Sequence, residues 1–414
     1  MKKKQWYKLD NIGNYYSVIN NSSRQVVFRY SATLSENVDE HVLDQALEES
    51  IKYYPNFNCH LKRGLFWYYL EKADKRVKVS RENKKICENL YRDDDDILYR
   101  VSYYHNRINL EVSHIISDGR GSISFFKCLL YKYLIIKYHL KDIEIENNSS
   151  FHEKIEDSYK KNYTKPKFRK LKKKTIYHLD EKKKKDNTFI EYHLSTSKVL
   201  ELAHSYNVNL TTLIIGVLIE AFHKQMSEKD KNKTIKIDVP VDLRKLFNSN
   251  TSRNFFGLSS VIYRYGDNDT LEDVLKSISK QLKINTTKEE LKIRMNQMIY
   301  LEKNIISRAV PIFIKEKALK IISNMNTSRC TSSVSNVGNI TIEPKLEKYV
   351  KNFNALITAD EMKLVIISYK DDLSIGISNR FVSNDVIKDF CNFFKSNGIE
   401  GTININQEED DEEV

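Results

Sequence analysis

The sequence predicts a mixed α/β fold, with α+β mixed sheets, divided into two lobes. The chain has 414 residues, which is enough for two or three domains and a large buried core. Helical and strand patterns alternate on both sides of a strongly basic stretch near the middle of the chain. Only 11 Gly and 5 Pro are present, so most of the chain is expected to be helix or strand.

In the first lobe, strand and helix patterns follow one another in a simple order. Ile108, Leu110 and Val112 alternate with polar residues, which is typical of a half-buried strand. The alternation breaks at 117–121, and an apolar stripe then predicts a helix that ends near Tyr138. Strands are expected at 25–30, 64–71, 76–80, 99–104 and 107–112, with a further helix at 37–53.

The second lobe repeats this mixture. The segment 211–226 is apolar on most sides, which indicates a helix buried against a sheet. Strands are expected at 189–194, 234–239, 257–265, 332–342, 352–358, 363–369 and 373–378. Helices are expected after 195, at 271–282, over most of 288–324, and at 385–395.

The net charge of +12 is concentrated in one segment. Residues 160–185 hold thirteen Lys and Arg against two acids, and the rest of the chain is close to neutral. This pattern favours a solvated connector between lobes; the alternative is a patch that attracts phosphates, lipid headgroups or an acidic carrier. No nucleic-acid partner is expected, because the cations are not spread over a groove. We expect lobes at 1–158 and 188–405, a basic connector at 159–187 and an acidic disordered tail at 406–414.

Cysteine usage and apolar runs indicate the compartment. The five Cys are scattered without a C-x-x-C pair, so neither a zinc site nor any other metal site is expected. The same pattern indicates a reducing compartment. The basic start is not followed by the apolar region of a signal peptide. The longest apolar run, 213–219, is far shorter than the roughly 20 residues that span a bilayer. We expect a cytoplasmic protein without a transmembrane segment, and a monomer by default.

The motif with the clearest chemistry is His114-Ile115-Ile116-Ser117-Asp118-Gly119. His114 ends a predicted strand, and the turn after it opens a helix whose first N–H groups point back toward that strand end. A neutral imidazole in this position can take a proton from a hydroxyl or an amine, which makes His114 a candidate general base. The plainer alternative is that His114 is merely packed and that Asp118 only caps the helix.

Four segments, taken in order, resemble the CoA-dependent acyltransferase superfamily, which includes chloramphenicol acetyltransferase, alcohol acetyltransferases and peptide-synthetase condensation domains. The family hallmark HHxxxDG reads here as Ser113-His114-Ile115-Ile116-Ser117-Asp118-Gly119. The later segments VPVDLR, NFFG and SNVG, at 239–244, 254–257 and 335–338, are similar to the family's other conserved stretches. The first hallmark histidine is replaced by Ser113. The resemblance implies only a secondary positioning role for that residue.

This resemblance implies two chloramphenicol-acetyltransferase-like lobes that form a V around a through-channel. It implies His114 as the catalytic base, and a structural ion pair between Asp118 and an arginine, for which Arg244 is the candidate. From the residues alone, Asp118 could instead orient His114 as in a catalytic triad. Gly119 would allow a tight turn where a side chain would crowd the channel.

The implied reaction moves an acyl group, acetyl among the candidates, from a coenzyme A thioester to an alcohol. No permanently bound cofactor is expected, since acyl-CoA acts as co-substrate. The oxyanion formed on the way needs a donor, which Ser335 or Asn336 could supply, with Ser113 as a further contact; alternatively 335–338 is only a polar turn. The open alternatives are an amine acceptor, an acyl-carrier protein as donor in a condensation reaction, and a non-catalytic binding protein with the same two-lobe shell.

Overall fold

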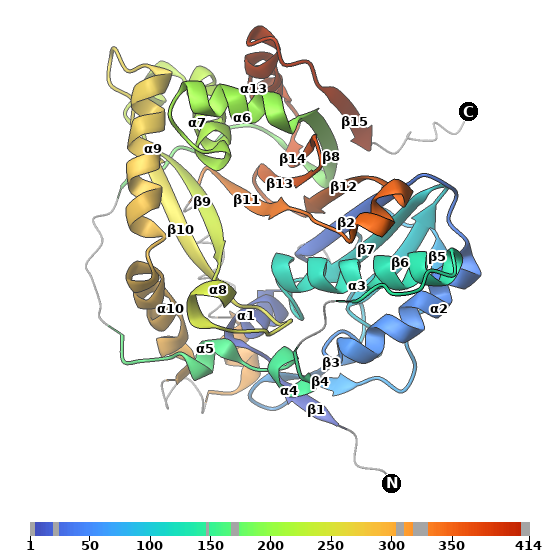
Figure 1. Ribbon diagram of the computed structural model, residues 1–414. Coiled ribbons are helices and arrows are strands. Elements are labelled where there is room, and N and C mark those ends of the chain that lie inside the picture. The colour runs from blue at the N-terminus through green and yellow to red at the C-terminus, as the bar shows by residue number, and fades with distance from the viewer. Residues whose placement is uncertain are drawn as a thin grey trace, which may run out of the picture.

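The computed structural model describes residues 5–19, 25–145, 149–166, 174–303, 310–317 and 330–406. Two lobes of mixed α/β structure lie side by side, the first at the right and the second at the upper left of Figure 1. Each lobe has its own main sheet and its own hydrophobic core. The predicted mixed α/β fold with two lobes is confirmed.

The first lobe contains a five-stranded sheet and a three-stranded sheet. In sheet order, the larger one runs β12 (Val350–Ile357), β2 (Val27–Leu34), β7 (Arg107–Ser113), β6 (Tyr99–Tyr104) and β5 (Ser80–Arg81). Helices α2 (Glu40–Ser50) and α3 (Gly119–Lys137) pack on it in one core. The smaller sheet runs β1 (Trp6–Lys8), β4 (Tyr68–Lys72) and β3 (Cys59–Arg63), and α1 (Asn11–Ile19) follows β1 in the chain.

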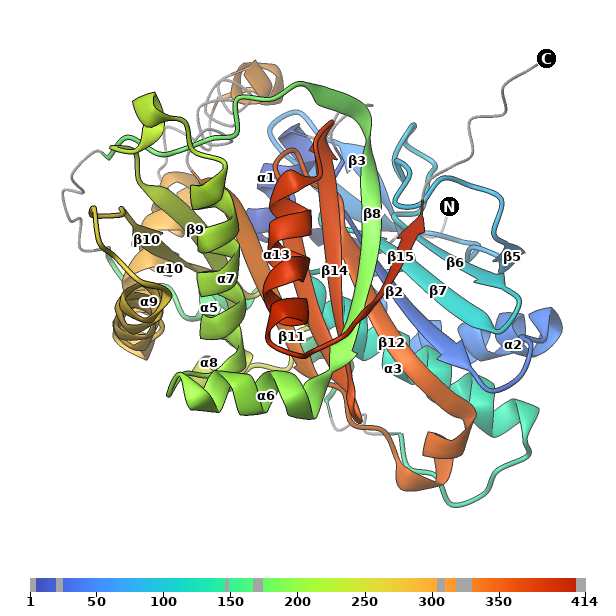
Figure 2. The same ribbon diagram turned by 90° about the horizontal axis from the view of Figure 1, so that it is seen from above.

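The second lobe is a seven-stranded sheet with helices on one face. In sheet order it runs β10 (Phe256–Tyr263), β9 (Ile235–Asp242), β11 (Ser332–Asn339), β13 (Lys363–Tyr369), β14 (Asp372–Phe381), β8 (Lys183–Ser195) and β15 (Thr402–Asn406). The main helices are α6 (Thr196–Ser205), α7 (Leu210–Lys224), α9 (Leu271–Asn285), α10 (Lys288–Lys303) and α13 (Asp385–Ser396). Figure 2 shows α7 and α13 lying over the strands of this sheet.

Several short helices connect these elements. They are α4 (Phe151–Lys154), α5 (Ser158–Lys161), α8 (Arg244–Phe247), η1 (Ile51–Tyr53), η2 (Glu228–Asp230) and η3 (Pro344–Tyr349). Within the described part of the chain, no single helix is long and apolar enough to cross a membrane. The pair α6 and α7, bent by 79°, passes such a test on length and composition alone.

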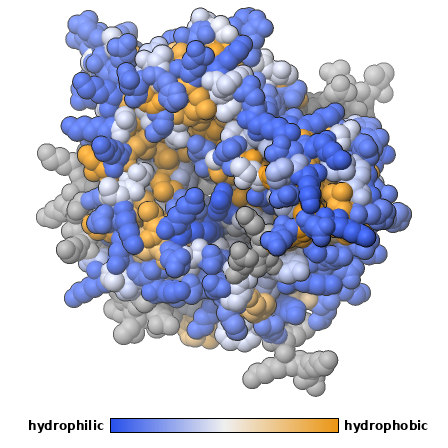
Figure 3. Space-filling model, viewed as in Figure 1, coloured by the Kyte–Doolittle hydropathy of each residue, from blue (hydrophilic) through white to orange (hydrophobic). Residues whose placement is uncertain are grey.

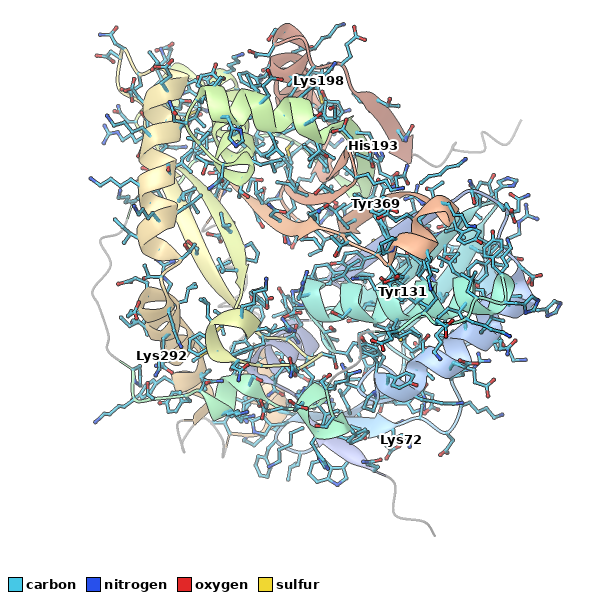
Figure 4. The ribbon with its side chains drawn as sticks, in the orientation of Figure 1. Lys72, Tyr131, His193, Lys198, Lys292 and Tyr369 are labelled. Atoms are coloured by element: carbon cyan, nitrogen blue, oxygen red, sulfur yellow. The ribbon has the colours of Figure 1, made fainter. Side chains whose placement is uncertain are left out.

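The lobes are joined by a strand exchange. β12 comes from the C-terminal stretch of the chain, yet it pairs antiparallel with β2 of the first lobe, with Ala355 opposite Tyr30. β12 also crosses closely over β14, because a Cβ on Gly376 would lie 1.9 Å from the carbonyl oxygen of Ala355. Tyr131 of α3 and Tyr369 of β13, labelled in Figure 4, belong to the same core at this junction. The predicted boundaries at 158 and 188 do not include this exchange.

Three sequence-based expectations about strands need correction. Of the predicted strand 64–71, only 68–71 is strand, in β4, because 64–67 form the turn of the β3–β4 hairpin, closed by the Gly64 N–H bonding the Trp67 carbonyl. Leu65 and Phe66 at its tip are exposed, so their apolar character mimicked a strand. Of the predicted strand 76–80, only Ser80 belongs to a strand, the short β5. β8 begins at Lys183, six residues earlier than the predicted 189, and its first residues belong to the predicted connector. Residues 304–309 and 318–324 of the predicted 288–324 helix lie outside the described residues.

Candidate active site

His114 stands at the end of β7, where the two lobes meet. Its backbone N–H donates to the Val26 carbonyl at 2.8 Å, which extends the β7 pairing with the first lobe. Its ring stacks on Tyr16 of α1 at 4.3 Å between centroids and lies 4.6 Å from the ring of Phe28 on β2. From the second lobe, the ring of Phe256 on β10 approaches to 5.6 Å. Both lobes therefore hold the imidazole, which is 5% exposed.

Asn254 fixes which nitrogen of His114 carries the proton. Its Nδ2 donates to the Asp10 carboxylate at 3.1 Å and to the His114 carbonyl at 3.2 Å. Both of these partners are acceptors, so the amide oxygen must point the other way, toward His114 Nδ1 at 3.0 Å. An amide oxygen can only accept, so Nδ1 carries the proton and Nε2 keeps its lone pair.

Asp10 lies behind Asn254 and is fully buried. Its carboxylate accepts from the Gly13 N–H at 2.7 Å, at the start of α1, and lies 3.4 Å from Arg253 Nε. Burial raises the pKa of Asp10 to about 6, while the nearby Arg253 guanidinium opposes that rise. Asp10 is therefore ionised near neutral pH and anchors the Asn254 amide.

The surroundings of His114 keep the imidazole neutral. Burial lowers the pKa of His114 to about 4, and the positive charge of Lys363 also lowers it. The negative charge of Asp118 and the hydrogen bond to Asn254 act in the opposite direction. A neutral ring with its Nε2 lone pair free is the form that accepts a proton, which is the chemistry of a general base.

Asp118 ties the two lobes together. It caps α3 by accepting from the Gly121 N–H at 2.8 Å, and it accepts from the Phe255 N–H of the second lobe at 2.7 Å. Arg244 makes a two-pronged pair with it, at 2.9 and 3.0 Å. Asp118 is 3% exposed. Within the described part of the chain no hydrogen bond joins Asp118 to His114, so Asn254, not Asp118, contacts the ring nitrogen.

Two glycines allow close packing beside the motif. A Cβ on Gly119 would lie 3.0 Å from the Tyr30 hydroxyl, which is a tight contact. A Cβ on Gly121 would lie 2.2 Å from the Ser252 carbonyl oxygen, which is impossible without movement of backbone. The start of α3 is therefore pressed against the 250–255 loop of the second lobe.

The three further candidates are separated in space. Ser113 is fully buried, and Gln25 Nε2 lies 3.4 Å from its hydroxyl, so the described structure does not present it to a substrate. Ser335 is half-buried and alternates along β11 with Val334, which faces the helices, so it lies on the face toward the first lobe. Asn336 is exposed on the other face, donates to Thr211 at 2.8 Å, and accepts from the Gly338 N–H.

The basic connector forms local ion pairs where it is described. Lys160 pairs with Asp157 and Lys161 with Glu156, both at 2.8 Å, and Lys183 pairs with Glu361 at 2.6 Å. These pairs offset part of the local positive charge and fit a solvated connector.

Sequence reasoning missed three residues that contact or support His114: Asp10, Tyr16 and Asn254. Asp10 directly precedes α1 and Tyr16 lies within it, and this helix was not predicted. Asp10 followed by a short helix was a usable signal, because aspartate is a preferred residue before a helix. Asn254 lies in the motif NFFG, which the sequence alone did not separate from a loop.

The two-lobe fold is shared with solved structures that include trichothecene acetyltransferases and peptide-synthetase domains. No family model matches the sequence, and no curated protein matches it. The family resemblance drawn from the motifs is thus confirmed at the level of the fold.

Three solved structures illustrate the shared fold. Polyketide synthase associated protein 5 from Mycobacterium tuberculosis is 11% identical, with 94% of this chain and 97% of that chain covered and a TM-score of 0.63. TRI101 of F. sporotrichioides, complexed with coenzyme A and T-2, is 11% identical, with 95% and 99% covered and a TM-score of 0.62. The epimerization domain of tyrocidine synthetase B is 12% identical, with 95% of both chains covered and a TM-score of 0.57.

Proposed function

We propose that this protein is an acyltransferase that moves an acyl group from a coenzyme A thioester to an alcohol, with His114 as the general base. The observation that carries the proposal is the fixed protonation of the imidazole, in which Asn254 holds the Nδ1 proton and leaves Nε2 free. The fold supports it, because structures of the same fold were solved with coenzyme A and with ethyl coenzyme A.

The proposed reaction uses that geometry. Nε2 of His114 takes the proton of the acceptor hydroxyl as its oxygen forms a bond to the thioester carbonyl carbon. The carbonyl oxygen becomes an oxyanion. When that intermediate collapses, the carbon–sulfur bond breaks and the imidazolium returns the proton to the leaving thiolate. The products are an ester and free coenzyme A, and no acyl-enzyme forms.

The contacts of Asn254 also favour the protonated ring that forms during the reaction. Asn254 presents its amide oxygen to Nδ1, and the ionised Asp10 lies on the other side of that amide. A positive charge on the ring is thereby favoured at the moment when it forms. For the oxyanion we propose Ser335 as donor, because it faces the first lobe, whereas both polar ends of Asn336 are already bonded on the other face.

The second candidate is acyl or peptidyl transfer from a carrier protein, or to an amine. Neighbours of the same fold include the epimerization domain of tyrocidine synthetase B and the cyclization-docking bidomain of EpoB. A pantetheine thioester has the same reacting carbon on a carrier as on coenzyme A, so His114 would play the same part.

A cytoplasmic location and a monomeric state also belong to the proposal. Size-exclusion chromatography tests the monomeric state.

Thiol release tests this function. Wild type is incubated with acetyl-CoA or longer acyl-CoA and a panel of alcohols and amines, while free thiol is followed. We expect His114→Ala to lower kcat by about 100- to 10,000-fold with unchanged folding by circular dichroism. His105→Ala, in the exposed turn between β6 and β7, is the matched control and should retain activity. Turnover by His114→Ala equal to wild type would refute the role of the ring.

The donor is tested in the same assay. Acyl-pantetheine attached to a carrier protein replaces acyl-CoA at equal concentration. Release only from the carrier would favour the condensation reaction. If neither donor releases thiol and calorimetry detects no coenzyme A binding, a non-catalytic binding protein is the better description.

A further inference from the structure

Four polar side chains form a row across the inner face of the seven-stranded sheet: Ser260, Asp238, Ser333 and Lys363. Each stands directly opposite the next, on β10, β9, β11 and β13. Residues opposite one another on neighbouring strands point to the same face. We call these four residues the polar row.

The polar row faces away from the helices of the second lobe. Its neighbours along the strands, Ile237, Val334 and Leu364, are at most 1% exposed and belong to the core under those helices. Side chains alternate between the two faces of a strand, so the polar row lies on the face toward the first lobe. All four of its residues are half-buried, which means that solvent reaches this face.

This inner face borders His114. Phe256, whose ring is 5.6 Å from the imidazole, lies on the same face of β10 as Ser260. Leu258 stands between them and is 44% exposed, so the first lobe does not cover this stretch of β10. Figure 3 shows hydrophobic surface in the area of β9 and β10. Lys363, at the other end of the polar row, lies on this same face of the sheet, and its positive charge lowers the pKa of His114.

The two charged residues of the polar row differ in their partners. Asp238 accepts from the Ser260 hydroxyl at 2.6 Å and pairs with Lys236 at 3.3 Å. For the Lys363 ammonium, the described residues provide no hydrogen bond and no ion pair within 4.0 Å. The carboxylates of Asp360, Asp238 and Glu361 act on it only through longer-range charge. An ammonium has three donors, and one that is partly removed from water is costly unless an anion meets it.

We propose that Lys363, with the Ser333 hydroxyl beside it, binds a carboxylate or phosphate group of a substrate in the space next to His114. This inference rests on the proposed function and names a substrate class for it. The thioester end of coenzyme A is neutral and its phosphates lie at the far end of the molecule. An anion beside the reacting carbon must therefore belong to the acceptor or to the outer end of the acyl group.

Matched substrate pairs test this site. Wild type, Lys363→Gln, Lys363→Arg and Ser333→Ala are assayed with acetyl-CoA and ω-hydroxy carboxylates of increasing length, each beside its neutral methyl ester. A second arm uses a neutral alcohol with succinyl-CoA or butyryl-CoA, to place the anion on the acyl group instead. Lys370→Gln, an exposed lysine of the β13–β14 turn, is the control. Circular dichroism verifies that each variant is folded.

We expect the anionic substrate of one arm to lose about 10- to 100-fold in kcat/KM with Lys363→Gln, as for a charge-assisted hydrogen bond. Its neutral counterpart should change by less than about threefold, and Lys363→Arg should recover part of the loss. Ser333→Ala should also lower kcat/KM more for the anionic substrate than for its neutral counterpart, but by a smaller factor than Lys363→Gln. The arm that shows the loss identifies the source of the anion.

Other results separate the two proposals. Turnover of neutral substrates with no preference for anions in either arm overturns the anion site and leaves the acyltransferase proposal standing. An equal loss for anionic and neutral substrates in Lys363→Gln also overturns it. Without any turnover, calorimetry with the same hydroxy carboxylates decides: binding that Lys363→Gln abolishes supports the anion site while the reaction fails, and absence of binding overturns both.

Discussion

Asp10 and Asp118 are both buried carboxylates at the junction of the lobes, yet they do different work. Asp118 meets the Arg244 guanidinium and two backbone N–H groups, so it joins the start of α3 to the 244–255 segment. Asp10 meets the Asn254 amide, and through it the His114 ring. One carboxylate holds the lobes together, and the other, through Asn254, keeps the proton of the His114 ring on Nδ1.

This contrast shows why a carboxylate near a histidine does not by itself make a triad. In a triad the acid contacts the imidazole directly. Here an amide stands between Asp10 and His114, so the ring contacts a neutral acceptor rather than a carboxylate, and burial lowers its pKa. Variants of the two regions should therefore separate into those that change stability and those that change the chemistry of the ring.

The largest effect is expected at the Asp118 junction. Arg244→Met leaves the Asp118 carboxylate buried without its partner and frees the carbonyls of Thr251 and Arg253 that Arg244 also bonds. Removal of one member of a buried ion pair costs about 3–5 kcal/mol. Urea unfolding should show that loss.

A matched control and a double variant sharpen this prediction. Arg264→Met removes an exposed arginine that bonds only Asn232 among the described residues, and should change stability by less than about 0.5 kcal/mol. The double variant Arg244→Met with Asp118→Asn should be more stable than Arg244→Met alone, because no unpaired charge remains. A double variant no more stable than the single one would contradict the ion-pair account.

The next largest effect is expected at Asn254. Asn254→Ala removes the acceptor for Nδ1 and lets the ring change its tautomer or turn, so kcat should fall by about 10- to 100-fold while KM changes little. Asn250→Ala, in the same loop but exposed and bonded to Glu153, is the control and should keep its activity. Equal kcat for wild type and Asn254→Ala would show that the amide does not position the base.

How much of this could be predicted from the sequence differs between the two regions. His114, Asp118 and Arg244 stand in motifs with a clear spacing, and the order of strands and helices around them followed from hydrophobic periodicity. The contacts of Asp10 and Asn254 with the His114 site could not be predicted in this way. Asn254 is 140 residues from His114 and 244 residues from Asp10 in the chain, and only the docking of the lobes brings the three together. The exchange of β12 is hidden for the same reason, since local patterns do not identify which sheet a strand joins.

The smallest effect is expected from acid, and it tests the environment of the ring. An imidazole with a pKa near 6.5 would lose most of its neutral form by pH 5, and activity would fall about 30-fold. With a pKa of about 4, His114 should keep most of its neutral form at pH 5, so protonation of the ring should lower kcat/KM by less than about twofold. A further fall with a midpoint near 6 would report protonation of Asp10 instead. The pH profile of thiol release, begun at pH 7, measures this difference.

The protein should stay folded over the pH range of that profile. The pKa of His114 is lowered on folding, so its contribution to stability is present above 6.5 and is lost as pH falls through 4. The pKa of Asp10 is raised from 3.8 to about 6, so its contribution is present below 3.8 and is lost as pH rises through 6. The two effects oppose each other between these limits.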